Sequence, residues 1–238
     1  MPGLFVTVFL MTGAAAFAQA PATAPAPPSS IVAEPEQDIV VIGLATPYRI
    51  AAGPLRKAQK TYAKGRATAA PGSTLFFRIS GVPTEGLALT LRDGDAVIAL
   101  PIDAAGRVVL PDLATRDWTL VANRTRGTLQ LRPLVMSTGT TMEDRRLGDL
   151  RLECAVKWAV APDVPFPVRA MFNAAGGCRS SRIAFYFKSP QPVAAASVTA
   201  ADGTVTALPV RPGGTSYRPP LSDRTLSDDM RVAIRFVR

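Results

Sequence analysis

Apolar and polar residues alternate along most of the chain from Thr74 onward. In the segment 75–79, Leu-Phe-Phe-Arg-Ile, the first, third and fifth side chains form one apolar series. Because successive side chains of a strand point to opposite faces, this two-residue period predicts half-buried strands. Six strands are predicted in this first block, near residues 75–79, 87–92, 96–102, 107–110, 118–123 and 129–132. The sequence Asp93-Gly94-Asp95 is typical of the tight turn that joins two strands.

A polar linker, Ser137 to Arg146, precedes a second block with the same kind of pattern. The residues Leu150, Leu152 and Cys154 predict a strand that buries one face, and Ala201-Asp202-Gly203 predicts a hairpin turn. Further strands are predicted near residues 183–188, 193–200, 205–210 and 231–236, and a short helix near residues 168–175.

These patterns predict an all-β fold. With 18 glycines and 22 prolines in 238 residues, the chain is rich in turn formers, as proteins of many short strands are. We expect two small Ig-like β-sandwich domains, residues 74–137 and 147–238, after a disordered N-terminal region. One larger β-sandwich is the alternative.

The first residues have the composition of an export signal. Residues 1–20 hold no charged side chain and include an apolar stretch from Leu4 to Met11, too short to span a membrane. Small residues at Ala16 and Ala18 predict cleavage after Ala18, with Ala20 as the alternative. We therefore expect a soluble periplasmic or secreted protein that is not a lipoprotein, with a Pro/Ala-rich tether over residues 19–38.

Two cysteines, Cys154 and Cys178, are the only ones in the chain, and they are separated by 24 positions. In an oxidising compartment an even pair predicts a disulfide. Closing a loop of this size stabilises the fold by about 3 kcal/mol in the chain-entropy model.

A basic segment precedes the first strand block. Six cationic side chains and no acidic one lie between Pro47 and Ser73, within a net charge of +9. A short surface helix is predicted from Pro54 to Gly65. Its cations are typical of a solvated basic face, and contact with a polyanion is the alternative. The candidate contact residues are Arg56, Lys57, Lys60, Lys64 and Arg66.

Candidates for catalysis are few. The chain has no histidine, which removes the commonest general base and the commonest transition-metal ligand. The pairs Asp93/Asp95 and Asp228/Asp229 are candidate glycosidase carboxylates, but both are predicted in turns, where Asp accepts hydrogen bonds from the local backbone. The spacing of Thr61 and Lys64 matches a lysine-activated nucleophile without any supporting residue. We expect no catalytic residue, cofactor or metal site.

The segment Asp38-Ile39-Val40-Val41-Ile42-Gly43 resembles the Ton box of TonB-dependent outer-membrane receptors. Six residues carry the resemblance, and the rest of the chain is too short for the plug and large barrel of such receptors. The chain also resembles proteobacterial periplasmic proteins with a segment of this kind before a β domain, which implies no activity. The resemblance implies strand addition to an envelope protein through Asp38, Ile39, Val40, Val41 and Ile42. The residues by themselves favour the simpler interpretation, in which Ile39–Ile42 form an edge strand of the first domain.

Three functional hypotheses follow. The first is a non-enzymatic binding or adaptor module of the cell envelope, which engages a protein or an anionic polymer rather than nucleic acid. The second is a hydrolase of envelope sugars that uses carboxylates such as Asp228 and Asp229. The third is a purely structural accessory domain.

The export signal can be tested directly. Intact-mass measurement of the protein recovered from the envelope should show a chain that begins at Gln19, because signal peptidase cleaves after small residues. A chain that still begins at Met1 would contradict the signal.

Overall fold

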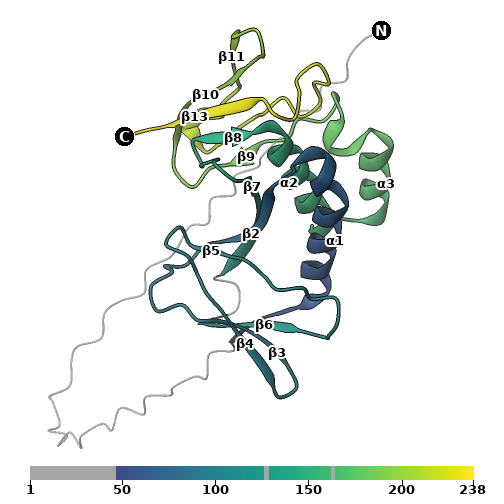
Figure 1. Ribbon diagram of the computed structural model, residues 1–238, viewed down its shortest axis with the longest axis vertical. Coiled ribbons are helices and arrows are strands. Elements are labelled where there is room, and N and C mark those ends of the chain that lie inside the picture. The colour runs from purple at the N-terminus through teal and green to yellow at the C-terminus, as the bar shows by residue number, and fades with distance from the viewer. Residues whose placement is uncertain (1–46, 126–128, 162–163) are drawn as a thin grey trace, which may run out of the picture. The chain divides into compact units, whose positions relative to one another are not determined.

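The computed structural model describes residues 47–125, 129–161 and 164–238. The described chain is β-rich, with antiparallel sheets and three α-helices (Figure 1). One sheet contains, in spatial order, β1 (Pro47–Ala51), β6 (Thr119–Thr125), β3 (Leu89–Asp93) and β4 (Ala96–Leu100). A second contains β5 (Arg107–Val108), β2 (Ser73–Ser80) and β7 (Gln130–Ser137).

The remaining sheets come from the C-terminal part of the chain. One contains β11 (Val205–Ala207), β10 (Val193–Thr199), β13 (Arg231–Phe236) and β8 (Asp144–Arg146). The other is a two-stranded ribbon of β12 (Ser216–Tyr217) and β9 (Phe187–Lys188). Two 3₁₀ turns, η1 (Gly177–Arg179) and η2 (Pro212–Gly214), complete the elements.

The three helices are α1 (Ala52–Ala69), α2 (Leu147–Val160) and α3 (Phe166–Ala174). Helix α2 corrects the prediction of a strand over residues 150–154, which was wrong. Leu150 and Cys154 pack into one apolar core, whereas Leu152 and Val156 pack into another. A helix that is buried on two faces has no clear 3.6-residue stripe, and a short apolar run is then ambiguous between helix and strand.

Helix α1 also differs from its prediction. It is longer than the expected helix from Pro54 to Gly65, and it packs along α2 instead of lying free on the surface (Figure 1). The predicted face of Leu55, Ala58 and Tyr62 is buried. Gly65 lies within the helix rather than at its end. A Cβ there would come within 2.6 Å of Leu152 Cδ1, so the glycine permits the close approach of α2.

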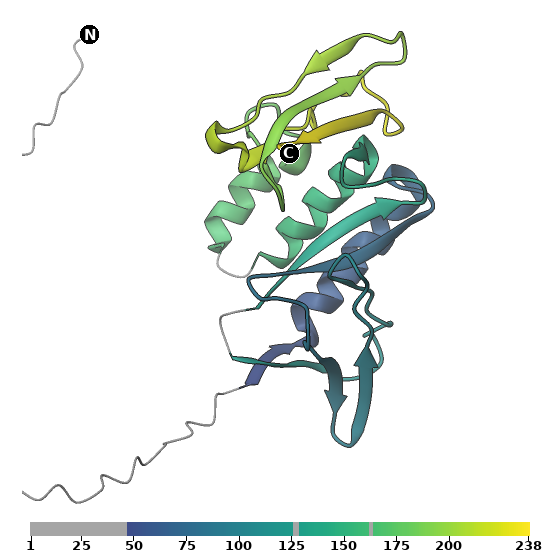
Figure 2. The same cartoon turned by 90° about the vertical axis from the view of Figure 1, so that its left-hand side faces the viewer.

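Two clusters of buried apolar side chains form the core. The first lies between α1 and the strands β2, β3 and β6, and the second lies against β10 and β13. Helix α2 contributes side chains to both, and in Figure 2 it lies between the C-terminal sheet and α1. The described residues therefore belong to one compact unit.

Several local predictions are confirmed. Strand β2 buries Leu75, Phe77 and Ile79, as its alternation predicted. The hairpins β3–β4 and β10–β11 form at the predicted turns, where Gly94 and Gly203 have positive φ values of 55° and 84°. Helix α3 lies within two residues of its predicted bounds. The strand predicted over residues 183–188 is reduced to β9.

The predicted disulfide is confirmed. Cys154 on α2 and Cys178 in η1 are bonded, with 6.0 Å between their Cα atoms. The β-rich class is confirmed as well, whereas the arrangement as two Ig-like sandwiches, residues 74–137 and 147–238, stays a prediction.

The junction of α1 and α2 is very close at Gly148, and this gives a prediction. A Cβ at Gly148 would overlap the carbonyl oxygen of Ala69 and come within 2.9 Å of Asp228 Cβ. The substitution Gly148→Ala should lower the free energy of unfolding by about 3 kcal/mol or more, because two backbone segments must move.

The matched control is Gly53→Ala in the first turn of α1, where no atom lies within 4 Å of the new Cβ. It should leave stability unchanged or raise it by up to about 1 kcal/mol. Urea unfolding measures both variants, and equal stability of the two would contradict the packing described.

Candidate functional site

Strand β7 is an edge strand whose free side is covered by helix α2. The backbone N–H of Ser137 donates to Asp149 Oδ2 at 2.7 Å, and the N–H of Val135 donates to Glu153 Oε2 at 3.1 Å. The third residue of this alternating set, Pro133, has no N–H to satisfy, and this is where an edge strand accepts proline. Side chains of α2 therefore take the place of a neighbouring strand.

The spacing of the two carboxylates explains the fit. Residues four apart on a helix are separated by about 6 Å along its axis, and residues two apart on a strand by about 6.7 Å. Asp149 and Glu153 are thus positioned to match Ser137 and Val135. Arg145 completes the arrangement, because its guanidinium donates to the Val135 carbonyl at 2.8 Å and to Glu153 Oε2 at 2.7 Å.

The side chains of Glu153 and Arg145 are deeply buried. The charges of their neighbours determine whether each of them is ionised. Burial alone would raise the pKa of Glu153, but the positive charges of Lys157 and Arg145 and the hydrogen bonds they donate hold it below its usual range. Burial would likewise lower the pKa of Arg145, yet Glu153 raises it overall. Both groups are therefore charged at neutral pH.

The edge of β2 that faces away from β7 is open near Leu75, in contrast to the covered edge of β7. Leu75 lies directly opposite Val135 in the β2–β7 register, and the N–H and C=O of Val135 point away from β2. In such a non-hydrogen-bonded pair the peptide groups of Leu75 also point outward. Strand β5 pairs only with Phe77 and Arg78, so in the described chain no strand lies beside β2 at Leu75.

A groove of about 690 Å³ lies along this open edge. Its floor is apolar and includes Tyr62, Leu75, Phe77 and Leu110, all of them buried. Val109, just after β5, is 49% exposed in the groove wall. The combination offers both strand-edge backbone groups and an apolar surface to a ligand.

The rim of the groove is cationic. Arg56, Lys60 and Arg66 of α1 line it, against the single acidic side chain of Asp112. Arg56 forms an ion pair with Asp117 at 3.0 Å, in which the Asp117 side chain is 90% exposed. Such a pair contributes little to stability.

Two polar side chains of α1 hold the groove in shape. The Gln59 amide nitrogen donates to the Pro111 carbonyl at 2.7 Å, and its amide oxygen accepts from the Leu113 N–H at 3.2 Å. The Tyr62 hydroxyl donates to the Ser73 carbonyl, which fixes the start of β2 against the helix. Helix, loop and strand edge are therefore tied together around the groove.

The predicted contact residues divide into two groups. Three of them, Arg56, Lys60 and Arg66, line the groove, whereas Lys57 and Lys64 are exposed on α1 and do not line it. Thr61 and Lys64 instead line a second groove, between α1 and the segment from α2 to η1, where no acidic side chain is present. The predicted partner strand, Asp38 to Ile42, lies outside the described residues.

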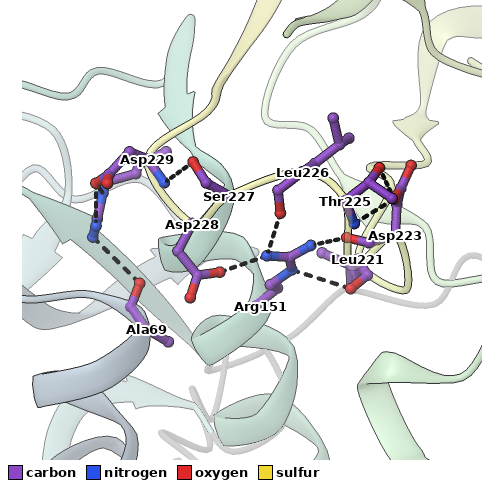
Figure 3. Close-up of polar contacts among 10 residues, drawn as sticks. Ala69, Arg151, Leu221, Asp223, Thr225, Leu226, Ser227, Asp228 and Asp229 are labelled. Atoms are coloured by element: carbon purple, nitrogen blue, oxygen red, sulfur yellow. Dashed lines mark hydrogen bonds and ion pairs between the residues drawn. The ribbon is translucent and has the colours of Figure 1, made fainter. Parts of the chain in front are cut away.

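The candidate hydrolytic carboxylates are engaged by arginines (Figure 3). Asp228 forms an ion pair with Arg151 at 2.6 Å, and Asp229 accepts from Arg146 Nε at 3.0 Å. The two carboxylates lie in a turn and each binds a different arginine. They do not face one another across a space for a sugar, as glycoside hydrolysis requires.

Asp93 and Asp95 lie at the β3–β4 turn, as predicted. Within residues 47–125, 129–161 and 164–238, no three Cys, Asp or Glu side chains gather as a metal site would require. In the same residues no helix has the length and apolarity needed to cross a membrane.

Sequence reasoning missed the groove and the covered edge. The groove depends on where β5 ends, and the cover depends on α2, which was predicted as a strand. One signal was present in the sequence: Asp149 and Glu153 have helical i, i+4 spacing in an otherwise apolar segment.

The depressed pKa of Glu153 predicts an acid sensitivity. A carboxylate whose folded pKa lies below its unfolded value of about 4.3 stabilises the fold above that value, and the contribution is lost as the pH falls through the folded pKa. In urea titrations between pH 7 and pH 3, Glu153→Gln should show a shallower loss of stability below pH 4.3 than the parent.

The same variant should be less stable at pH 7 by about 3–5 kcal/mol, because it leaves the Arg145 charge buried without its partner. Glu143→Gln, at an exposed position beside β8, is the control and should match the parent throughout. Identical pH profiles for all three proteins would contradict the buried ion pair.

No protein-family model matches the chain, no curated protein matches it, and no solved structure matches it.

Proposed function

We propose that this protein is a non-enzymatic binding module of the bacterial envelope. In this proposal the groove beside β2 holds an extended segment of a partner protein that is both apolar and acidic. The observation that carries the proposal is the open edge of β2 at Leu75, at the floor of an apolar groove with a cationic rim.

Strand addition explains the backbone part of the site. An extended segment that lies beside β2 would bond to the outward N–H and C=O of Leu75 and continue the sheet where β5 ends. Main-chain bonds of this kind do not depend on the partner's sequence, so they supply affinity. The alternate side chains of the segment supply selectivity.

Apolar contacts and charge determine which segment fits. One set of alternate side chains would pack on Tyr62 and Phe77, and the burial of each Val- or Leu-sized group would stabilise the complex by about 1.5–3 kcal/mol. Acidic side chains would lie near Arg56, Lys60 and Arg66, and complementary charge raises the association rate and excludes basic segments. An anionic amphiphile such as an alkyl phosphate shares part of this chemistry but does not use the strand edge.

Location outside the cytoplasm belongs to the same proposal. It is supported by the expected export signal and by the disulfide between Cys154 and Cys178, a bond that is rare in reducing compartments. The Ig-like two-domain arrangement is not needed for it.

The proposal predicts a charge effect that is specific to the groove. A fluorescent ten-residue peptide of alternating Val and Glu should bind the purified protein, and Lys60→Glu combined with Arg66→Glu should weaken it at least tenfold. The matched control, Lys57→Glu combined with Lys64→Glu, changes the same net charge on the same helix outside the groove. It should weaken binding by no more than about twofold to threefold, because these two side chains do not line the groove and exposed charges are partly screened at 0.15 M salt.

Fluorescence anisotropy measures the affinities, and ¹⁵N NMR shows whether the Leu75 amide shifts. Equal losses in both double variants would indicate unspecific attraction of anions to α1. Binding of dodecyl phosphate without binding of the peptide would replace the protein partner with an amphiphile.

A further inference from the structure

A second site lies on the other face of the same sheet. Arg78 of β2 and Arg132 of β7 are direct register partners, so their side chains leave the sheet on one face with Cβ atoms about 5 Å apart. Like charges directly opposite each other destabilise a strand pair. None of the ion pairs formed within the described residues includes either arginine.

More cations converge on these two arginines. Arg145, Lys157 and Lys188 line the same small pocket, and Glu153 is its only carboxylate. Glu153 is already bonded to Arg145 and Lys157. The pocket therefore holds five cationic side chains against one anionic side chain.

Arg145 adds an unsatisfied donor to this excess of charge. Its side chain is 2% exposed, and its Nε–H has no hydrogen-bond partner in the described part of the chain. A buried donor without a partner costs about 1–3 kcal/mol. Both the excess of positive charge and the unpaired donor favour the binding of an anion in this pocket.

The pKa of Arg78 also indicates an excess of positive charge in this pocket. Burial, helped by the neighbouring charges of Arg132 and Arg145, lowers the pKa of Arg78 despite the opposing effect of Glu153. A bound anion would offset this repulsion. Tyr217 also lines the pocket, and burial raises the pKa of its hydroxyl, which stays protonated and available as a donor.

The size of the pocket limits what it can hold. Its volume is about 20 Å³, while a single water needs about 10–15 Å³ on the same kind of measure. One small anionic group fits, and the remainder of a larger ligand must lie outside. Guanidinium groups present forked N–H donors that match the paired oxygens of carboxylate or phosphate.

We propose that the pocket formed by Arg78, Arg132 and Arg145 binds a single oxyanion group, the carboxylate or phosphate of a ligand whose remainder lies outside the pocket. This site is independent of the groove beside β2, because the side chains of Arg78 and its neighbour Phe77 point to opposite faces of the strand.

Thermal unfolding of the purified protein tests the proposal. Sodium chloride is replaced stepwise by sodium acetate or sodium phosphate at constant pH and ionic strength. The Tm of the parent should rise by about 3–6 °C when the oxyanion reaches ten times its Kd. Arg78→Gln and Arg132→Gln should bind the anion at least tenfold more weakly and show no such rise.

The Tm values of these two variants show whether the arginines bind a ligand or only stabilise the fold. In chloride alone each variant should be as stable as the parent or more stable, because the substitution removes one of two like charges at paired positions of β2 and β7. A purely structural arginine would instead lower the Tm in every buffer, and that result would overturn the proposal. Arg235→Gln, at an exposed position of β13, is the matched control and should respond to each anion as the parent does.

The two anions distinguish the ligand classes. A rise with acetate and phosphate alike indicates a site for carboxylates as well as phosphates, whereas a rise with phosphate alone restricts it to phosphate groups. No difference between the oxyanions and chloride in the parent, or an equal rise in the parent and in Arg78→Gln, would refute the oxyanion site.

Discussion

The cover that α2 places over the free side of β7 is the constraint on which the other features depend. An uncovered edge strand presents a row of unpaired backbone groups that invites pairing with other chains. Here Asp149 and Glu153 accept the outward N–H groups of β7, and Arg145 donates to its outward carbonyl. The sheet is thereby closed on one side, and the open edge of β2 is the place where a further strand can add.

The same contacts bring the two cores together. Helix α2 can point Asp149 and Glu153 at β7 only if it lies directly beside that strand, and its other side chains then contact both cores. The disulfide to Cys178 attaches the segment after α3 to the same helix. Burying a charged pair is costly unless every member is bonded, which explains why Lys157 also donates to Glu153.

Elements whose contacts lie close in the sequence could be predicted from it, whereas elements that depend on distant contacts could not. Strands β2, β6 and β13 and the turns at Gly94 and Gly203 follow from neighbours in the chain, so local patterns were sufficient. Helix α2 was mistaken for a strand because tertiary packing buries two of its faces. The Arg78–Arg132 contact depends on the register of strands more than 50 residues apart, which no local pattern contains.

Successive side chains of β2 point to opposite faces of the sheet, and each of the two proposed sites uses one of these faces. Phe77 faces the groove and the first core, and Arg78 faces the small cationic pocket. A change in the pairing of β2 with β7 by one residue would exchange these faces and abolish both sites together. Both sites thus rest on one strand register.

The close approach at Gly148 has a consequence for recognising related proteins. Four positions in nine residues are physically constrained together: Arg145 and Glu153 by their ion pair, Asp149 by Ser137, and Gly148 by the backbone of Ala69. Divergence erodes overall similarity long before it can alter such a set. The spacing Arg-x-x-Gly-Asp-x-x-x-Glu between two strand-rich blocks is therefore a search pattern for distant relatives.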